Sequence, residues 1–374
     1  MSKIKVLQIA FNDLGHGGIQ SLIMTITKKL SSEIKEDIIV FNSKSAYYDE
    51  EFKKYGKIFK CPNYEGNNWL RKKIDYYIRY FKIKKNILYI LKEYGPYDVV
   101  HSHTFFEAAP CMAAAKKMGV PIRIAHSHNT AMKDNRIIVL RIINKLYQTI
   151  YRYIILKNST DRIGCSQAAA DYLFGKGNGK SIPNCVDYKI FKKNNFPDKD
   201  WKELRLIHIG NFLPQKNQLF LIEVFYELLK MKEDSHLVMI GRSGEYLEKV
   251  HQRIQELGIG DKIDILPHDS YVPRELSKAD YFIFPSSFEG FGNVMLEAQA
   301  AGLHCFASTE VTKEVDCGLV SFLPLKKGAK EWAKFILTFY EEKGTEKKDI
   351  DMSQFSEEVF AQKFLNLYKK SVKR

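Results

Sequence analysis

Long apolar runs are missing from this sequence of 374 residues. No stretch of about 18 consecutive apolar residues occurs, so the sequence predicts no membrane-spanning helix. The first residues, MSKIKVLQIAFND, have the pattern of a strand and not that of a signal peptide. The six cysteines form no Cys-x-x-Cys pair and their spacings do not repeat, which argues against a disulfide framework. We therefore expect a cytoplasmic protein in a reducing compartment.

Acidic residues are scarce in the first half of the chain. Residues 1–195 contain 33 lysines and arginines against 16 aspartates and glutamates, whereas the remaining residues contain 25 against 28. This asymmetry indicates that the first half faces an anionic partner, such as nucleic acid, anionic lipid or a phosphorylated substrate. Hydrophobic residues make up 45% of the chain, which allows a packed core, and the length favours two domains.

Apolar strand patterns alternate with amphipathic helical patterns in both halves. The strand patterns lie at residues 4–11, 37–41, 98–102 and 122–127, and again at 204–210, 236–241, 262–266 and 281–285. Strands that alternate with helices predict βαβ units and doubly wound sheets. We expect an α/β fold of two Rossmann-like domains that face each other across a cleft.

A polar segment with two prolines, IPNCVDYKIFKKNNFPDKD, separates the two blocks of strands. The predicted domains are residues 1–190 and residues 203–352, joined by a linker at 191–202. The last residues, 353–374, contain an amphipathic helix that we expect to cross back to the first domain.

The segment FPSSFEGFGNVMLEAQAAG at residues 284–302 has the most chemical content. A strand ends there, a glycine-containing loop follows, and a helix begins near Gly292. Backbone amides at such a helix start form an anion site. Glu289 and Glu297 lie eight residues apart, and carboxylates accept hydrogen bonds from the vicinal hydroxyls of a sugar.

This Glu-x7-Glu segment resembles the signature of the retaining glycosyltransferases of family 4, which have the GT-B fold. The resemblance extends along most of the chain, through GHGGIQSLIMTITKKL, RIAHSHNT, IGCSQAAADYLFG, SIPNCVD and HIGNFLPQKN. The segments RIAHSHN and GCSQAAADYLFG are most similar to the corresponding segments of enzymes of bacterial exopolysaccharide and capsule assembly. The Glu-x7-Glu segment is quite specific, whereas the glycine loop alone is not.

The resemblance implies how the donor diphosphate would be bound. Lys216 would neutralise it, and the backbone amides of Gly292, Asn293 and Val294 would contact the phosphates. The sequence departs from the family at Asn211, where arginine is usual, and this removes one positive charge. Arg242, in the turn IGRSG, is a candidate substitute.

The rest of the donor is assigned in the same way. Glu297 would hold the ribose and Glu289 the hydroxyls of the donor sugar, while the backbone of Leu266, Pro267 and His268 would lie along the base. The family's habits favour a UDP-linked donor. A second departure, His304 where proline is usual, is expected to affect local geometry.

The glycine loop LGHGGIQ lacks the third glycine of a dinucleotide fingerprint. The strand at 37–41 is followed by Asn42 and not by an acid that would bind an NAD ribose, so a nicotinamide enzyme is disfavoured. In the family, the glycines that correspond to Gly17 and Gly18 let the backbone approach the donor. His16 is placed near the acceptor or the diphosphate.

The tripeptide His-Ser-His occurs twice, at residues 101–103 and 126–128. Residues two apart in a strand point to one face, a spacing that zinc sites also use. A metal site would need a carboxylate in a convincing position, and satisfied polar residues at strand ends are the plainer alternative. The family places one histidine of this strand at the reaction centre. His128 fits best, with His126 as the other candidate, and His103 would line the acceptor side.

No side chain is an obvious nucleophile, and for the family a front-face attack is favoured in which the leaving phosphate helps to take the acceptor proton. The catalytic assignments are thus His128 or His126 with Glu289 and Lys216. No metal is expected, because the Asp-x-Asp sequences at 198–200 and 349–351 lie in charged, loop-like segments and do not end an apolar strand. The nucleotide sugar is a substrate, and no cofactor is predicted.

Basic amphipathic helices are predicted at residues 69–92, with eight basic residues against one acid, and at 136–157, with five against none. They fit either a solvated basic face over a packed stripe or a surface that lies on anionic lipid at the inner leaflet. An undecaprenyl-diphosphate-linked saccharide acceptor would explain the bias. Three other interpretations are a GT-B nucleotide-sugar epimerase, a metal-dependent hydrolase and a nucleic-acid-binding protein, although the sequence contains no nucleic-acid-binding module.

Overall fold

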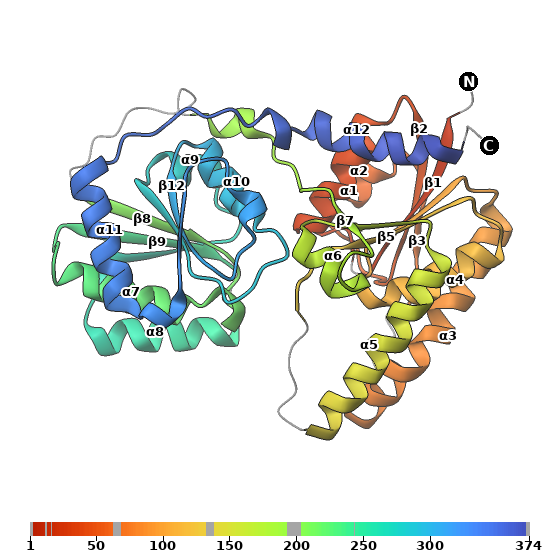
Figure 1. The fold of residues 1–374 in the computed structure, drawn as a ribbon, viewed down its shortest axis with the longest axis horizontal. Coiled ribbons are helices and arrows are strands. Elements are labelled where there is room, and N and C mark those ends of the chain that lie inside the picture. The colour runs from red at the N-terminus through yellow and green to blue at the C-terminus, as the bar shows by residue number, and fades with distance from the viewer. Residues whose placement is uncertain are drawn as a thin grey trace. The chain divides into compact units, whose positions relative to one another are not determined.

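The computed structural model describes residues 3–11, 13–15, 17–62, 69–131, 138–192, 203–242 and 244–371. The chain divides into two compact units (Figure 1). The first contains residues 1–184 together with 357–374, and the second contains residues 185–356. The boundary predicted from the sequence lies at residue 190, and most of the predicted linker, residues 193–202, lies outside the described residues.

The first unit is built on a seven-stranded parallel sheet with the order β3-β2-β1-β4-β5-β6-β7. Its strands are β1 (Ile4–Ala10), β2 (Ile34–Val40), β3 (Ile58–Lys60), β4 (Val99–Ser102), β5 (Ile122–Ser127), β6 (Asp161–Gly164) and β7 (Lys180–Ser181). Its helices are α1 (Gly18–Lys29), α2 (Asp49–Phe52), α3 (Trp69–Tyr94), α4 (Ala108–Lys117), α5 (Ile138–Asn158), α6 (Gln167–Phe174) and α12 (Glu357–Tyr368).

Helices cover both faces of the first sheet, which is why its central strands are almost continuously buried. The helices α3, α4, α5 and α6 pack against one face through a large apolar cluster. The opposite face carries α1 and α12, and Figure 1 shows α12 lying along this side of the sheet. The last helix of the chain therefore belongs to the first unit.

The second unit is built on a six-stranded parallel sheet with the order β10-β9-β8-β11-β12-β13. Its strands are β8 (Leu204–Ile209), β9 (Ser235–Gly241), β10 (Ile263–Pro267), β11 (Tyr281–Phe284), β12 (His304–Ser308) and β13 (Val320–Leu323). Its helices are α7 (Gln218–Leu229), α8 (Glu245–Leu257), α9 (Val272–Ser277), α10 (Asn293–Ala300) and α11 (Ala329–Lys343). Here α7, α8 and α11 pack on one face, and α9 and α10 lie on the other (Figure 1).

The strand order of each sheet reverses at one point, between β1 and β4 in the first unit and between β8 and β11 in the second. In doubly wound sheets, ligands bind outside the carboxyl ends of the strands at this switch point. The predicted site residues follow the same strands, since the glycine loop follows β1, His103 follows β4, Asn211 follows β8 and Glu289 follows β11. The fold thus collects two groups of predicted residues, one in each unit.

Candidate active site

Two loops meet at the switch point of the second unit, residues 210–217 after β8 and residues 285–292 after β11. Gln215 joins the two loops through both its backbone and its side chain. Its backbone oxygen accepts a hydrogen bond of 2.8 Å from the amide of Ser287, and its side-chain amide donates one of 2.8 Å to the carbonyl of Phe288. The two loops therefore form a single framework around the residues that they carry.

Lys216 and Glu289 form an ion pair within this framework, with Nζ 2.7 Å from Oε1. The ammonium also lies 4.9 Å from the centre of the Phe284 ring, at the end of β11. Gly210 leaves room for the lysine, because a Cβ there would lie only 3.2 Å from Lys216 Cδ. The side chains of Lys216 and Glu289 are 17% and 9% exposed, so the pair is well shielded from water.

The helix α10 begins directly after this loop. Gly292 caps it with a φ of 93°, a left-handed conformation that glycine adopts without strain. A side chain there would also approach the Phe284 ring to 3.2 Å. The start of a helix offers backbone amides that its own i→i−4 hydrogen bonds do not use, and α10 begins with Asn293 and Val294, where the sequence predicts an anion site.

Glu297 lies one turn further along α10 and is partly exposed. Burial of its carboxyl group raises its pKa to about 7. A carboxyl that is half protonated near neutral pH both accepts and donates hydrogen bonds, which suits a diol as a partner. The two carboxyl groups of the predicted eight-residue interval thus lie in different environments, Glu289 in an ion pair with Lys216 and Glu297 inside α10.

Asn211 and Arg242 are brought together by the adjacent strands β8 and β9. The side-chain oxygen of Asn211 accepts a 3.4 Å hydrogen bond from the Arg242 backbone amide, and the Phe212 amide donates a 3.3 Å bond to the Arg242 carbonyl. Both side chains are exposed. Arg242, the candidate substitute, therefore follows β9 and lies beside Asn211, the position at which the family usually has arginine.

Leu266, Pro267 and His268 lie at the carboxyl end of β10, the edge strand two positions from β8. Pro267 and His268 are exposed, and Ser270 donates hydrogen bonds to the Pro267 carbonyl from its amide and its hydroxyl. The structure places this segment at the same edge of the sheet as Lys216. Its predicted contact with a base stays a prediction.

One residue near the ion pair was missed. His208, in β8, is fully buried and its Nδ1 donates a 2.9 Å hydrogen bond to the carbonyl of Ile283, while its Nε2 has no partner. Burial, with Lys216 nearby, lowers its pKa to about 4. The sequence offered one signal, a lone histidine inside the apolar run LRLIHIG, where a buried polar ring needs a hydrogen-bond partner.

The glycine loop of the first unit lies between β1 and α1. Gly17 is the residue before α1, and a Cβ there would lie 2.4 Å from the Gln20 side-chain oxygen. Asp13 organises the loop by accepting a 3.0 Å bond from the Gly15 amide. Gly18 is exposed at the start of the helix, and His16 lies outside the described residues.

The four histidines of the two His-Ser-His runs lie together on the face of the first sheet that carries α12. His101 Nε2 is 3.2 Å from His126 Nδ1, and His103 Nδ1 is 2.9 Å from His128 Nε2. His101 and His126 are fully buried, His103 is 5% exposed, and His128 is partly exposed. The structure therefore does not separate His126 from His128 by position alone, because their rings are 4.1 Å apart.

Burial lowers the pKa of every histidine in this group. The pKa of His128 falls to about 3, and those of His101, His103 and His126 lie well below the usual value, with the neighbouring histidines lowering them further. A positive charge on one ring would lie beside three other histidine rings in a buried environment. All four rings are neutral at physiological pH.

Three further polar side chains extend this group, and none of them was predicted from the sequence. Gln8 of β1 contacts His103, Tyr368 of α12 contacts His101, and Glu36 of β2 contacts Gln8. Burial raises the pKa of Glu36 to about 7. A signal was available for Gln8 and Glu36, since each is a polar residue on the inward face of an apolar strand.

His101, His103 and His126 form the one group of possible metal ligands among the described residues, with ring nitrogens within 4.8 Å of one another. A zinc ion is bound by unprotonated ring nitrogens that each lie about 2.0–2.1 Å from the metal. Both nitrogens of His101 and of His103 are already hydrogen-bonded to protein groups. The arrangement therefore fits a hydrogen-bonded network better than a metal site.

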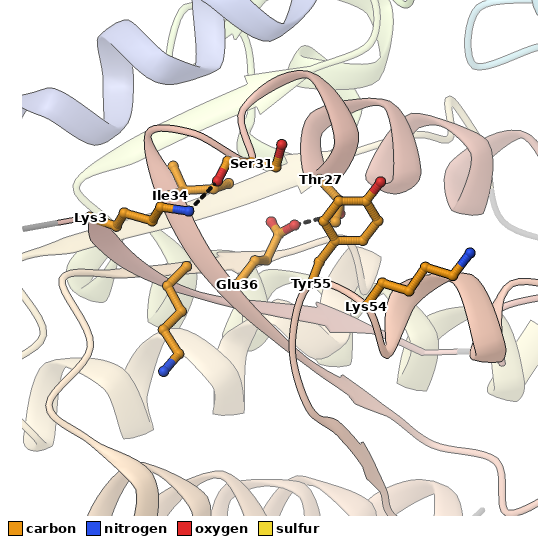
Figure 2. A pocket seen from close by; sticks show the side chains of 8 residues that line it. Lys3, Thr27, Ser31, Ile34, Glu36, Lys54 and Tyr55 are labelled. Atoms are coloured by element: carbon orange, nitrogen blue, oxygen red, sulfur yellow. Dashed lines mark hydrogen bonds between the residues drawn. The ribbon is translucent and has the colours of Figure 1, made fainter.

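A pocket of about 450 Å³ opens on the other edge of the first sheet, near the amino ends of β1 and β2. Lys3, Ser31 and Lys54 stand at its rim, and Glu36 lies at its base with its carboxylate turned toward Thr27 (Figure 2). This edge is opposite to the one where doubly wound sheets bind ligands. We therefore do not include the pocket in the candidate site.

The helix α5 carries two apolar stripes. Tyr147, Tyr151 and Ile155 are buried against the sheet, whereas Ile142, Leu146, Ile150 and Tyr153 are exposed. Phe81 of α3 is also exposed, to 71%. Lys145 and Lys157 lie beside the exposed stripe, and both long helices project beyond the sheet in Figure 1. No helix among the described residues is long and apolar enough to cross a membrane.

Two family models match adjacent parts of the chain. Residues 16–189 match the model described as Glycosyltransferase Family 4, and residues 188–316 match the model described as Glycosyl transferases group 1. Together they span residues 16–316, which lie in both units and include the histidine runs, Lys216, Glu289 and Glu297.

Curated relatives agree with these matches. The putative glycosyltransferase EpsF of Bacillus subtilis is 28% identical over 352 residues, which cover 90% of this chain and 87% of the relative. The capsular polysaccharide biosynthesis glycosyltransferase CapH of Staphylococcus aureus is 26% identical, covering 79% of this chain and 78% of its own. The UDP-Gal:alpha-D-GlcNAc-diphosphoundecaprenol alpha-1,3-galactosyltransferase of Escherichia coli is 27% identical, covering 59% of this chain and 60% of its own.

Solved structures share the fold over the whole chain. Alr3699/HepE of Anabaena, in complex with UDP and glucose, is 15% identical with a TM-score of 0.68 and covers 99% of this chain and 98% of its own. The sucrose-phosphate synthase of Thermosynechococcus elongatus is 15% identical with a TM-score of 0.76 and covers 99% and 100%. The two α/β units therefore form the GT-B fold of these glycosyltransferases.

Proposed function

We propose that this chain, which belongs to the family 4 glycosyltransferases, transfers a sugar from a UDP-linked donor to a saccharide on undecaprenyl diphosphate in the synthesis of a bacterial surface polysaccharide. The names of the relatives support the donor, the acceptor and the process. Their agreement with the two family models favours this function over an epimerase, a hydrolase and a nucleic-acid-binding protein.

The ion pair of Lys216 and Glu289 at the start of α10 is the observation that carries the proposal. A donor diphosphate carries charge that Lys216, the amides of α10 and Arg242 can neutralise. When the diphosphate binds, Lys216 pairs with it and releases Glu289, whose carboxylate then accepts hydrogen bonds from the hydroxyls of the donor sugar. Glu297 binds the ribose diol.

The reaction proceeds with retention through front-face attack of the acceptor hydroxyl. The bond from the anomeric carbon to the diphosphate breaks with its electron pair going to the leaving oxygen, and the acceptor proton passes to a phosphate oxygen. The protein contributes positive charge where the leaving group develops negative charge, and it positions the acceptor. His128 or its neighbour His126 contacts the sugar at the reaction centre, and His103 lies on the acceptor side.

The transfer is proposed to need no metal ion. Lysine, arginine and a helix terminus supply the positive charge that a metal provides elsewhere. Of the two Asp-x-Asp sequences, residues 198–200 lie outside the described residues, and residues 349–351 follow α11 in a segment without a strand. There Asp351 accepts a 2.9 Å hydrogen bond from the Ser353 amide, as a turn residue does.

The protein is further proposed to work as a cytoplasmic enzyme on the inner face of the cell membrane. The exposed stripe of α5 is not needed to bury a core, since the opposite stripe of the same helix does that. An apolar stripe beside lysines suits the boundary between headgroups and acyl chains of anionic lipid. A lipid-linked acceptor would be reached from that position.

The test is an assay of sugar transfer with a panel of UDP-sugars and an undecaprenyl-diphosphate-linked saccharide, with EDTA present in parallel reactions. Transfer that persists in EDTA, with the anomeric configuration of the donor kept in the product as seen by NMR, is the expected result. Inversion of configuration, or a strict metal requirement, would contradict the corresponding part of the proposal.

A further inference from the structure

A buried chain of hydrogen bonds begins at Gln8, beneath α1 and α12. Its side-chain nitrogen donates to Glu36 Oε1 over 2.6 Å and to the Tyr368 hydroxyl oxygen over 3.2 Å. Both amide hydrogens are then used, and the remaining group, Oε1, can only accept. It lies 3.0 Å from His103 Nε2, so this nitrogen must carry a hydrogen.

The first branch continues from His103 to His128. A neutral imidazole with a hydrogen on Nε2 has a bare Nδ1, which acts as an acceptor. Nδ1 of His103 lies 2.9 Å from Nε2 of His128, so His128 donates and also carries its hydrogen on Nε2. Its own Nδ1 is left as a buried acceptor without a partner.

The second branch runs through α12. The Tyr368 hydroxyl accepts from Gln8 and lies 2.8 Å from Nδ1 of His101, and we assign the second contact as a donation from the hydroxyl to Nδ1. His101 then carries a hydrogen on Nε2 and donates to Nδ1 of His126 over 3.2 Å. The Nε2–H of His126 is left as a buried donor without a partner.

We propose that Gln8 and Tyr368 are positioning residues that hold all four histidines in the tautomer with the hydrogen on Nε2, so that His128 presents an acceptor and His126 a donor. The two rings lie 4.1 Å apart. A hydroxyl group, which donates once and accepts, complements this pair. The identification of that hydroxyl as one of a bound sugar rests on the proposed function, whereas the tautomers do not.

Two features of the site maintain this directionality. Desolvation keeps each ring neutral, so no ring can donate from both nitrogens at once. Phe364 of α12 lies against the rings of His101 and His126, with ring centres 5.1 and 5.4 Å away, and excludes water that could serve as an alternative partner. The last helix of the chain therefore supplies both a hydrogen bond and a cover.

The test is long-range ¹H–¹⁵N NMR of the full chain with ¹⁵N-labelled histidine, in which a bare ring nitrogen and a protonated one are well separated. The four rings are assigned by single His→Gln variants. We expect all four to show a protonated Nε2 and a bare Nδ1, unchanged from pH 6 to 8. A protonated Nδ1 on any of them, fast averaging between tautomers, or a metal bound in stoichiometric amount would overturn the proposal.

Two conservative variants test the two branches. Tyr368→Phe removes the donor to His101 and should cause averaging at His101 and His126 while His103 and His128 keep their signals. Gln8→Met removes both the acceptor of His103 and the donor to the Tyr368 hydroxyl, so it should release His103 and His128 and, through Tyr368, also His101 and His126. Averaging at His103 and His128 in Tyr368→Phe, or wild-type signals at His103 and His128 in Gln8→Met, would contradict the proposal. If the wild type shows the expected tautomers but binds no nucleotide sugar, the proposed function alone is refuted.

Discussion

The Nζ atom of Lys216 and the Oε1 atom of Glu289 are 2.7 Å apart, although 73 residues separate them in the chain. Their strands, β8 and β11, are neighbours in the second sheet, and both residues lie in the loops that follow the carboxyl ends of these strands. The pair joins the cation that the sequence assigns to the diphosphate with the carboxylate that it assigns to the sugar. Its disruption should therefore affect turnover more than folding.

Lys216→Ala is expected to lower kcat by about 10²–10³-fold, because removal of one aligned group that stabilises developing charge typically costs about 3–4 kcal/mol of barrier. Steady-state kinetics with the donor found in the transfer assay measure this. The matched control is Lys230→Ala, which removes an ammonium that pairs with Glu227 over 2.6 Å on the surface of the same unit. Similar kcat values for both variants would remove Lys216 from the mechanism.

Glu289→Gln keeps the shape of the side chain and removes its charge. If Glu289 accepts hydrogen bonds from the donor sugar, kcat/KM should fall by at least about tenfold, since a hydrogen bond to a charged group contributes about 1.5–3 kcal/mol. Binding of free UDP, which lacks the sugar, should stay within about twofold of wild type or become tighter, because Lys216 is no longer held by a carboxylate. Loss of UDP binding together with activity would argue for a purely structural pair.

Gly292→Ala should lower the free energy of unfolding by about 1–2 kcal/mol, because a residue with a Cβ is strained at the φ of 93° found there. The new Cβ would also lie 3.2 Å from the Phe284 ring, so the start of α10 should shift and UDP binding should weaken. Chemical denaturation and UDP titration measure the two effects.

Gly318→Ala separates strain from crowding at Gly292. Gly318 has a similar φ of 99°, but a Cβ there would meet no atom within 4 Å. It should lose comparable stability and keep UDP binding. If both variants bind UDP as tightly as wild type, the start of α10 is not a phosphate site.

Stability should fall as the pH falls below about 6.5. Burial lowers the pKa of six histidines, among them His128 to about 3, and His208 and His304 to about 4. The unfolded chain then binds more protons than the folded one, so each group contributes a loss of about 1.4 kcal/mol per pH unit below its unfolded pKa. Glu36 and Glu297 act in the opposite sense between about pH 4.5 and 7, because their pKa values are raised to about 7.

Six histidines outweigh two carboxyl groups, so urea unfolding between pH 5 and 7 should give a free energy that rises with pH. His304→Phe offers a matched comparison, since a phenyl ring can keep the packing against Phe339, whose ring centre is 4.1 Å away. This variant should reduce the slope by the contribution of one proton. A free energy of unfolding that does not change over this range would show that the histidines titrate normally.

Vesicle flotation tests the exposed stripe of α5. Leu146→Ser should reduce binding to vesicles with anionic lipid by about tenfold, because burying a leucine side chain contributes about 1.5–3 kcal/mol. Lys145→Glu should weaken binding further at low salt, since each basic residue near such a surface contributes about 1 kcal/mol. Met231→Ser, at an exposed position of the second unit, should bind as wild type. An absence of binding by the wild type at low salt would remove the membrane hypothesis.

Strand periodicity gave much of the fold from the sequence. The strand pattern at 122–127 coincides with β5, and the pattern at 281–285 differs from β11 by one residue. The strands β3, β6, β7, β12 and β13 were not predicted, because two to five residues carry little periodicity. The strand β2 begins three residues before its predicted start, since Glu36 interrupts the apolar run but points inward.

The site was less accessible to sequence reasoning than the fold. A local motif identified Lys216, Glu289 and Glu297. Gln8 and Tyr368 could not be found in this way, because their importance arises from contact across 360 residues of sequence. Parallel register aligns Gln8 with His101, and the packing of α12 adds Tyr368, so only the folded chain shows that the histidines share a directional network.

Thermal unfolding of the wild type and of Lys216→Ala, each with UDP, GDP, ADP and dTDP at equal concentration, tests the central claim most directly. A nucleotide at about 100 times its Kd should stabilise the folded chain by about 2.7 kcal/mol. UDP should raise the melting temperature of the wild type by more than the other nucleotides do, and Lys216→Ala should lose most of this shift. No shift with any nucleotide, or an equal shift in both proteins, would contradict the claim.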